Sequence, residues 1–140
     1  MTGAGPLVLV YSSHAQHRAE IIAALGSRPS PDLPPITVIE TATAPTVITR
    51  LDEGGIDLAI LDGEAAPTGG IGLARQLRDE IEPCPPLLVI TARKADGWLA
   101  TWSHADAWVS HPLDPFALAG AAAGLLMAAA ARHTAAEFRE

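Results

Sequence analysis

The sequence predicts an α/β domain with a parallel five-stranded sheet that is covered by helices on both faces. Five short, continuous apolar runs recur along the chain, as is typical of strands buried on both faces. Stretches with apolar residues at helical spacing separate these runs and follow the last one. This alternation favours right-handed crossovers and one parallel sheet. The length of 140 residues suits a single domain with an ordinary core.

Strands and helices are expected in strict alternation. Strands are predicted over residues 6–11, 36–39, 56–61, 86–90 and 107–109. Apolar residues at helical spacing mark the five helices: Ile21, Ile22 and Leu25; Val47, Ile48 and Leu51; Ile71, Leu73, Leu77 and Ile81; Leu99 and Trp102; Phe116, Leu118, Leu125 and Leu126. Gly26 and Gly54 are expected to end the first two helices, and Pro45 lies where the second begins. Asp114 followed by Pro115 is typical of the start of the last helix.

The last helix is expected to run past the domain. The predicted domain covers residues 1–126, and residues 127–140 form a helical extension, because alanine-rich helical composition continues to about Phe138. Such a segment is either a frayed tail or an arm that becomes ordered against a partner. The sequence leaves both alternatives open.

Charge and composition argue against several classes of function. Nine basic and sixteen acidic residues give a formal net charge of −7, and the arginines are scattered, so direct binding to nucleic acid or anionic lipid is not expected. We expect no apolar run that approaches the roughly 18 residues needed to cross a bilayer, and the N-terminus lacks a signal-peptide pattern. The single cysteine, Cys84, has no disulfide or zinc-site companion. We therefore expect a cytoplasmic protein without membrane insertion.

Polar residues follow the predicted strands at the edge where parallel α/β sheets gather their ligands. Each run ends before at least one such residue: Ser12 and Ser13, Glu40 to Thr43, Asp62, Thr91 and His111. Because the carboxyl ends of parallel strands meet at one edge, these residues are the candidates for chemistry.

Four stretches resemble the receiver domain of two-component response regulators. "LAILD" with Pro67 and Gly70 is similar to the phosphoacceptor strand and its loop, and "LLVITA" carries a hydroxyl at Thr91. "WVSHPLDP" resembles the fifth strand with its proline, and "VLVYSSHAQHR" the first strand with Arg18 beyond it. The resemblance implies a flavodoxin-like (βα)5 fold with strand order 2-1-3-4-5. It also implies a phosphoacceptor position at Asp62 and a switch hydroxyl at Thr91.

The chain departs from the receiver pattern at the residues that carry the chemistry. Ser12 and Ser13 stand where the family has an acidic pair, and His111 stands where it has a lysine. Phosphoryl transfer to a carboxylate needs a hard cation. Asp62 and Glu64 alone would supply few carboxylate ligands for magnesium. Histidine is mostly neutral at cytosolic pH, unlike lysine. We therefore expect no catalysis, weak magnesium binding at most, and an inactive phosphoacceptor position at Asp62.

Plainer interpretations of these residues also stand. Asp62 is then a hydrogen-bonded carboxylate at a strand end, while Ser12, Ser13 and Thr91 bond to nearby backbone or cap a helix. The spacing of the histidines gives no pattern that would place three on one metal, so no metal site is predicted; the residues concerned are His14, His17, His104 and His111.

All three tryptophans lie between the fourth strand and the fifth helix. Trp98 and Trp102 are four residues apart and share one helix face, whereas Trp108 lies on the last strand and is equally suited to the core. In receivers, the fourth helix, fifth strand and fifth helix form the usual partner or dimer surface. The resemblance therefore implies a protein contact there, with another protein or with a second copy, and tryptophan is frequent among interface anchors.

These observations predict a stand-alone, atypical receiver that acts as a protein-interaction module independently of phosphorylation. The chain, including "LDGEAAP" and "WLATWS", is also similar to orphan receiver-like proteins that accompany respiratory NADH dehydrogenase in some high-GC bacteria. That similarity implies a location at the inner face of the membrane, through a protein complex. Two alternatives remain: a response regulator phosphorylated on Asp62, and a flavodoxin-like nucleotide or flavin binder, since "SSHAQH" is rich in hydroxyls.

Overall fold

The computed structural model describes residues 5–137, and all statements about its elements refer to them. The strands are β1 (Leu7–Tyr11), β2 (Thr37–Thr41), β3 (Leu58–Asp62), β4 (Leu87–Thr91) and β5 (Ala107–Ser110). The α-helices are α1 (Ala15–Leu25), α2 (Ala44–Glu53), α3 (Gly70–Glu80), α4 (Gly97–Trp102) and α5 (Pro115–Glu137), and a 3-10 turn, η1 (Lys94–Asp96), precedes α4.

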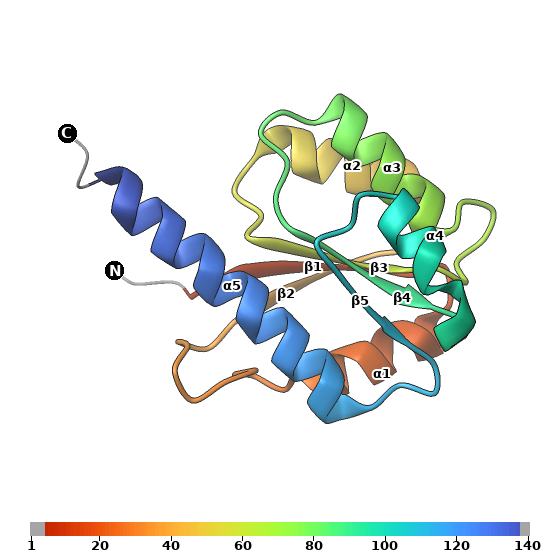
Figure 1. Cartoon of the computed structure of the whole chain (residues 1–140), viewed down its shortest axis with the longest axis horizontal. Coiled ribbons are helices and arrows are strands. Elements are labelled where there is room, and N and C mark those ends of the chain that lie inside the picture. Colours follow the sequence, from red (N-terminus) through yellow and green to blue (C-terminus); the bar gives the residue numbers. More distant parts are fainter. Residues whose placement is uncertain (1–4, 138–140) are drawn as a thin grey trace.

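The five strands form one parallel sheet in the order β2-β1-β3-β4-β5, which confirms the predicted fold (Figure 1). The predicted strand ends differ from the observed ones by at most two residues. All five residues of β3 and of β4 are buried, which explains why both strands read as continuous apolar runs in the sequence.

Helices cover both faces of the sheet, and each face has its own core (Figure 1). Successive side chains of a strand point to opposite faces, so Leu9 and Tyr11 pack toward α2 and α3, whereas Val8 and Val10 pack toward α1 and α5. The short helix α4 lies beside β5 and α3. At the carboxyl end of β3, α1 lies on one side and the loop before α3 on the other.

The expected helix boundaries are present. Gly26 and Gly54 are the C-caps of α1 and α2, with positive φ angles of 63° and 85° that suit glycine. Pro45 lies in the first turn of α2. The backbone N–H of Phe116 donates to Asp114 Oδ1 at 2.9 Å, so Asp114 caps α5 ahead of Pro115.

The helix α5 runs without a break from Pro115 to Glu137, and residues 138–140 of the predicted extension lie outside the described residues. The expectation of no long apolar stretch was wrong. An 18-residue window, Pro115–Arg132, has a mean hydropathy of 1.4, long and apolar enough to cross a membrane by length and composition, and 22% of it is buried. Its buried residues belong to the core on that face of the sheet; they are Leu118, Ala122, Ala123 and Leu126.

Candidate functional site

The site is built around Asp62, the last residue of β3. Its side chain is only 1% exposed, although it lies at the end of a strand. Gly70, the first residue of α3, passes directly beside it: a Cβ at Gly70 would lie 2.7 Å from the Asp62 carbonyl oxygen. The glycine therefore allows α3 to begin against the end of β3, and this close approach helps to bury the carboxylate.

Both oxygens of Asp62 are bound by donors from within the chain. Oδ2 accepts the hydroxyl of Ser12 at 2.7 Å and lies 2.8 Å from Nδ1 of His17, on α1. Oδ1 accepts the backbone N–H of Glu64 at 2.9 Å. The Ser12 hydroxyl is itself oriented by the backbone N–H of His14 at 3.0 Å, so the start of α1 and the end of β3 are joined through this cluster.

The contact between His17 and Asp62 shifts both groups toward their charged forms. The hydrogen bond to Asp62 raises the pKa of His17 against the opposing effect of burial, and the nearby carboxylates of Glu64 and Glu20 add to the rise. Burial alone would raise the pKa of Asp62, but the hydrogen bonds from the Glu64 backbone, His17 and Ser12 together lower it. The contact thus favours the protonated form of His17 and the ionised form of the buried carboxylate.

Three of the four histidines singled out in the sequence come together here. The ring centroids of His14 and His17 lie 4.7 Å apart, and those of His17 and His111 lie 5.6 Å apart. His111 Nε2 lies 3.3 Å from Glu64 Oε1, yet this buried atom makes no hydrogen bond with any described residue. His104 lies apart from this group, in the turn after α4.

Sequence reasoning missed this cluster, although one signal for part of it was present. His14 and His17 are three residues apart at the start of α1, a spacing that brings side chains near one another on one helix surface. The spacing does not show that this surface of α1 faces the carboxyl ends of the strands, which is what brings both histidines to the cluster around Asp62.

The other expected site residues bond to backbone. Ser13 Oγ accepts the backbone N–H of Ala66 at 2.9 Å, and the Thr91 hydroxyl donates to the Arg93 carbonyl at 2.9 Å. Arg18 donates to the Ser12 carbonyl at 2.8 Å. These bonds tie the loops around Asp62 to the strand ends.

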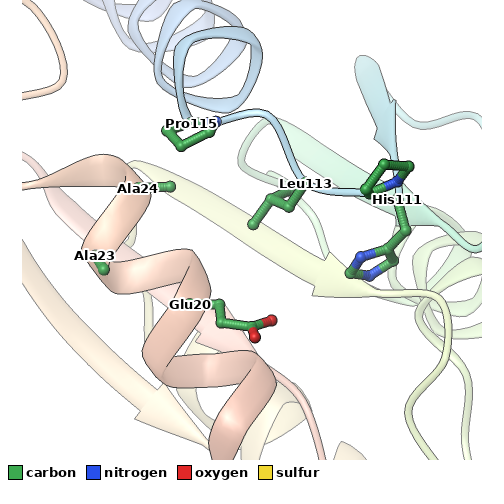
Figure 2. A pocket seen from close by; sticks show the side chains of 7 residues that line it. Glu20, Ala23, Ala24, His111, Leu113 and Pro115 are labelled. Atoms are coloured by element: carbon green, nitrogen blue, oxygen red, sulfur yellow. The ribbon is translucent and has the colours of Figure 1, made fainter.

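A cavity of about 540 Å³ adjoins the cluster between α1 and the connection from β5 to α5 (Figure 2). Glu20, Ala23 and Ala24 form its wall on α1, and His111, Pro112, Leu113 and Pro115 form the opposite wall. His111 therefore lies between this cavity and the Asp62 cluster.

The tryptophans form a second feature, on α4 and β5. Trp98 is 67% exposed and Trp102 is 51% exposed, and the guanidinium of Arg75 lies 5.1 Å from the Trp102 ring centroid. The sequence left Trp108 equally suited to the core or the surface, and in the structure its side chain is partly packed and partly exposed. It lies against Gly97, where a Cβ would be 2.4 Å from its ring, yet remains 39% exposed. Phe116, 89% exposed, was not anticipated as a surface aromatic.

Proteins of similar sequence are response regulatory proteins. Two from Mycobacterium tuberculosis, one from strain CDC 1551 / Oshkosh and one from strain H37Rv, are each 56% identical to this chain over 123 residues. The match covers 88% of this chain and 92% of each relative. No protein-family model matches the chain.

Solved structures with the same fold are receiver domains. A putative Luxo repressor receiver from Vibrio parahaemolyticus has a TM-score of 0.77 at 14% identity, covering 93% of this chain and 96% of its own. The receiver of a Francisella response regulator has a TM-score of 0.73 at 16% identity, covering 87% and 97% respectively. Identities this low show the fold alone, whereas the mycobacterial relatives show the family. The chain therefore belongs to the response regulators, and its fold is that of their receiver domains.

Proposed function

We propose that this receiver is a protein-interaction module that works independently of phosphorylation and catalyses no reaction of its own. The observation that carries the proposal is the state of Asp62, whose two carboxylate oxygens are bound by Ser12, His17 and the Glu64 backbone. Under this proposal, the domain exerts its regulatory effect by binding another protein.

Phosphorylation of Asp62 faces two physical obstacles. One carboxylate oxygen must be free to attack phosphorus, but Oδ2 is shared between the Ser12 hydroxyl and the His17 imidazole, and the Asp62 side chain is almost inaccessible to solvent. A cation must also neutralise the incoming phosphoryl oxygens. The oxygen ligands that magnesium prefers are scarce, because the hydroxyls of Ser12 and Ser13 are engaged with Asp62 and Ala66.

The surface proposed for partner contact lies on α4, β5 and α5. Every exposed large apolar side chain among residues 5–132 belongs to these three elements: Trp98, Trp102, Trp108, Phe116 and Met127. Aromatic side chains grouped in this way are typical of interface anchors. We therefore propose that a protein partner, or a second copy of the chain, binds here.

We propose that the partner belongs to a larger assembly, such as respiratory NADH dehydrogenase, at the cytoplasmic face of the membrane. The sequence similarity in "LDGEAAP" and "WLATWS" supports this assignment. The net charge of −7 is consistent with attachment through protein contact, because it disfavours direct binding to anionic lipid or nucleic acid.

Intact-mass analysis after incubation with acetyl phosphate and magnesium tests the proposal. The expected result is no phosphate adduct under conditions that label an ordinary receiver, which serves as the control. A stoichiometric adduct that disappears in Asp62→Asn would instead establish a phosphorylated response regulator, the alternative favoured by the position of Asp62 at the end of β3. A yellow purified protein would indicate the flavin-binding alternative, which the engaged hydroxyls of Ser12 and Ser13 disfavour.

A further inference from the structure

We propose that the cluster around Asp62 binds a divalent transition-metal ion of the zinc class, with four ligands: His17, Asp62, Glu64 and His111. The inference goes beyond the proposed function and does not depend on it, because it uses neither the aromatic surface nor the reactivity of Asp62 toward phosphate. It also replaces the sequence-based expectation of no metal site.

Three donor atoms already face one another. One ring nitrogen of His17 and one carboxylate oxygen each from Asp62 and Glu64 lie within 4.8 Å of one another. A tetrahedral ion with bonds of about 2.0–2.1 Å holds its donor atoms roughly 3.3 Å apart. His17 Nδ1 and Asp62 Oδ2, now 2.8 Å apart, therefore need to separate by about 0.5 Å to admit such an ion.

His17 and Glu64, which must move to admit an ion, are more exposed than Asp62 and so have room to move. The side chains of Glu64 and His17 are 42% and 29% exposed, whereas that of Asp62 is 1% exposed. Asp62 is also held in place by the Ser12 hydroxyl and the Glu64 backbone N–H. Hydrogen bonds of this kind orient a metal-binding carboxylate, so the fixed ligand is already aligned and the mobile ligands can close around the ion.

His111 supplies the fourth donor. Its Nε2 lies 3.3 Å from Glu64 Oε1 but makes no hydrogen bond with any described residue, although the atom is buried. A buried polar atom without a partner carries a desolvation cost. An ion between the imidazole and the Glu64 carboxylate would satisfy both groups, and the cavity lined by His111 gives a route of entry (Figure 2).

The donor set distinguishes this site from a magnesium site. Magnesium requires octahedral coordination and favours oxygen, whereas imidazole nitrogen suits zinc, copper, nickel and iron. Here the imidazole of His17 joins the carboxylates of Asp62 and Glu64, and the imidazole of His111 lies 3.3 Å from Glu64. The hydroxyls of Ser12 and Ser13 stand where an acidic pair would supply oxygen. The site should therefore bind zinc far more tightly than magnesium.

Metal titration of tag-free, chelator-treated protein tests the inference. Zinc ion alone, titrated in competition with a chromogenic chelator, should bind at one equivalent, while magnesium ion alone should not saturate at micromolar concentration. His17→Gln and His111→Gln should each weaken zinc binding by at least about tenfold, because each removes a direct ligand. His104→Asn is the matched control, since it removes a histidine outside the cluster, and it should leave the affinity unchanged.

Cobalt ion is the spectroscopic probe, because tetrahedral cobalt absorbs visible light strongly. The absorption should appear with one equivalent of cobalt, fall in His17→Gln and persist in His104→Asn. Thermal unfolding of the metal-free variants checks their fold, and Glu64→Gln, on an exposed loop, takes the place of any variant that does not fold. The inference is overturned if zinc binding is not saturable, or if the cluster variants and His104→Asn weaken it equally.

Discussion

Nδ1 of His17 lies 2.8 Å from Oδ2 of Asp62, which joins α1 to the end of the central strand β3 by a charge-assisted contact. The imidazole that pairs with the buried carboxylate thus comes from α1, within the domain. The contact determines how stability should respond to pH, and metal-free protein is the form in which to measure that response.

The stability contribution of this pair should be largest in mildly acidic solution. The pKa of His17 is raised above 6.5, so its contribution is fully present below that value and is lost as pH rises through the folded-state pKa. The pKa of Asp62 is lowered below 3.8, so its contribution is present above that value and is lost as pH falls through the folded-state pKa. The window of greatest stabilisation therefore lies between these two ordinary values.

Urea unfolding of the wild type and His17→Gln at pH 5 and pH 8, with a chelator present, measures this effect. The difference in unfolding free energy between the two proteins should be greater at pH 5. The charged groups that face His17 are Asp62, Glu64 and Glu20, and protonated His14 or His111 would oppose them. A difference that grows toward pH 8 would contradict the assignment, and His104→Asn should show no such trend.

Gly70→Ala should destabilise the domain by about 1–3 kcal/mol, because the added Cβ would lie 2.7 Å from the Asp62 carbonyl oxygen and must displace backbone. Gly72→Ala, two residues further into α3 with no atom within 4 Å of its Cβ, is the matched control. It should stabilise the helix by about 0.5–1 kcal/mol. Thermal unfolding compares the two, and equal effects would mean that α3 does not depend on the close approach.

Trp98→Ala and Trp102→Ala should weaken partner capture while keeping the fold. Truncation of an interface anchor costs about 2 kcal/mol or more in binding, whereas exposed residues contribute little to stability. Trp98→Ala should change the unfolding free energy by less than about 0.5 kcal/mol. Trp102→Ala should cost up to about 1 kcal/mol, because it also loses the contact with Arg75.

Affinity capture with mass spectrometry, together with sedimentation for self-association, checks the tryptophan variants. Circular dichroism and melting temperature establish whether they remain folded. Asp62→Ala should capture the same proteins as the wild type. If it alone abolished capture, the strand ends rather than the tryptophan surface would be the contact site.

Gly97→Ala should displace the indole of Trp108, because the new Cβ would lie 2.4 Å from its ring. With Trp98 and Trp102 replaced by phenylalanine, the emission of Trp108 should shift to longer wavelength as the ring becomes more exposed. Gly124→Ala, on α5 with open space around its Cβ, should leave the emission unchanged. An unchanged spectrum in Gly97→Ala would show that the contact is not maintained in solution.

The fold could be predicted from local patterns, because its strongest signals are local. The strands β1, β3 and β4 are apolar except for Asp62 and Thr91 at the ends of the last two, because both faces of the central strands are covered. Gly26 and Gly54 end their helices at positions with positive φ. The apolar character of α5 was missed because alanine and glycine separate its larger side chains, so no run of large apolar residues appears.

The site was only partly predictable, because its geometry depends on contacts between distant segments. The position of Asp62 follows from the end of an apolar run, but His17 reaches it across 45 residues of sequence. His111 comes from a third segment. Their meeting depends on how α1 is placed over the sheet, which residue spacing within a single segment does not encode.

The length of α5 sets how far from the sheet a contact can be made. The helix has 23 residues and spans roughly 35 Å, about twice the span of a five-residue strand of this sheet. Leu126 is its last buried residue among those whose burial is described, and the helix continues to Glu137, roughly 16 Å further. Figure 1 shows this end leading away from the sheet. For a protein bound at this end, the length of the helix beyond Leu126 therefore sets the distance from the sheet.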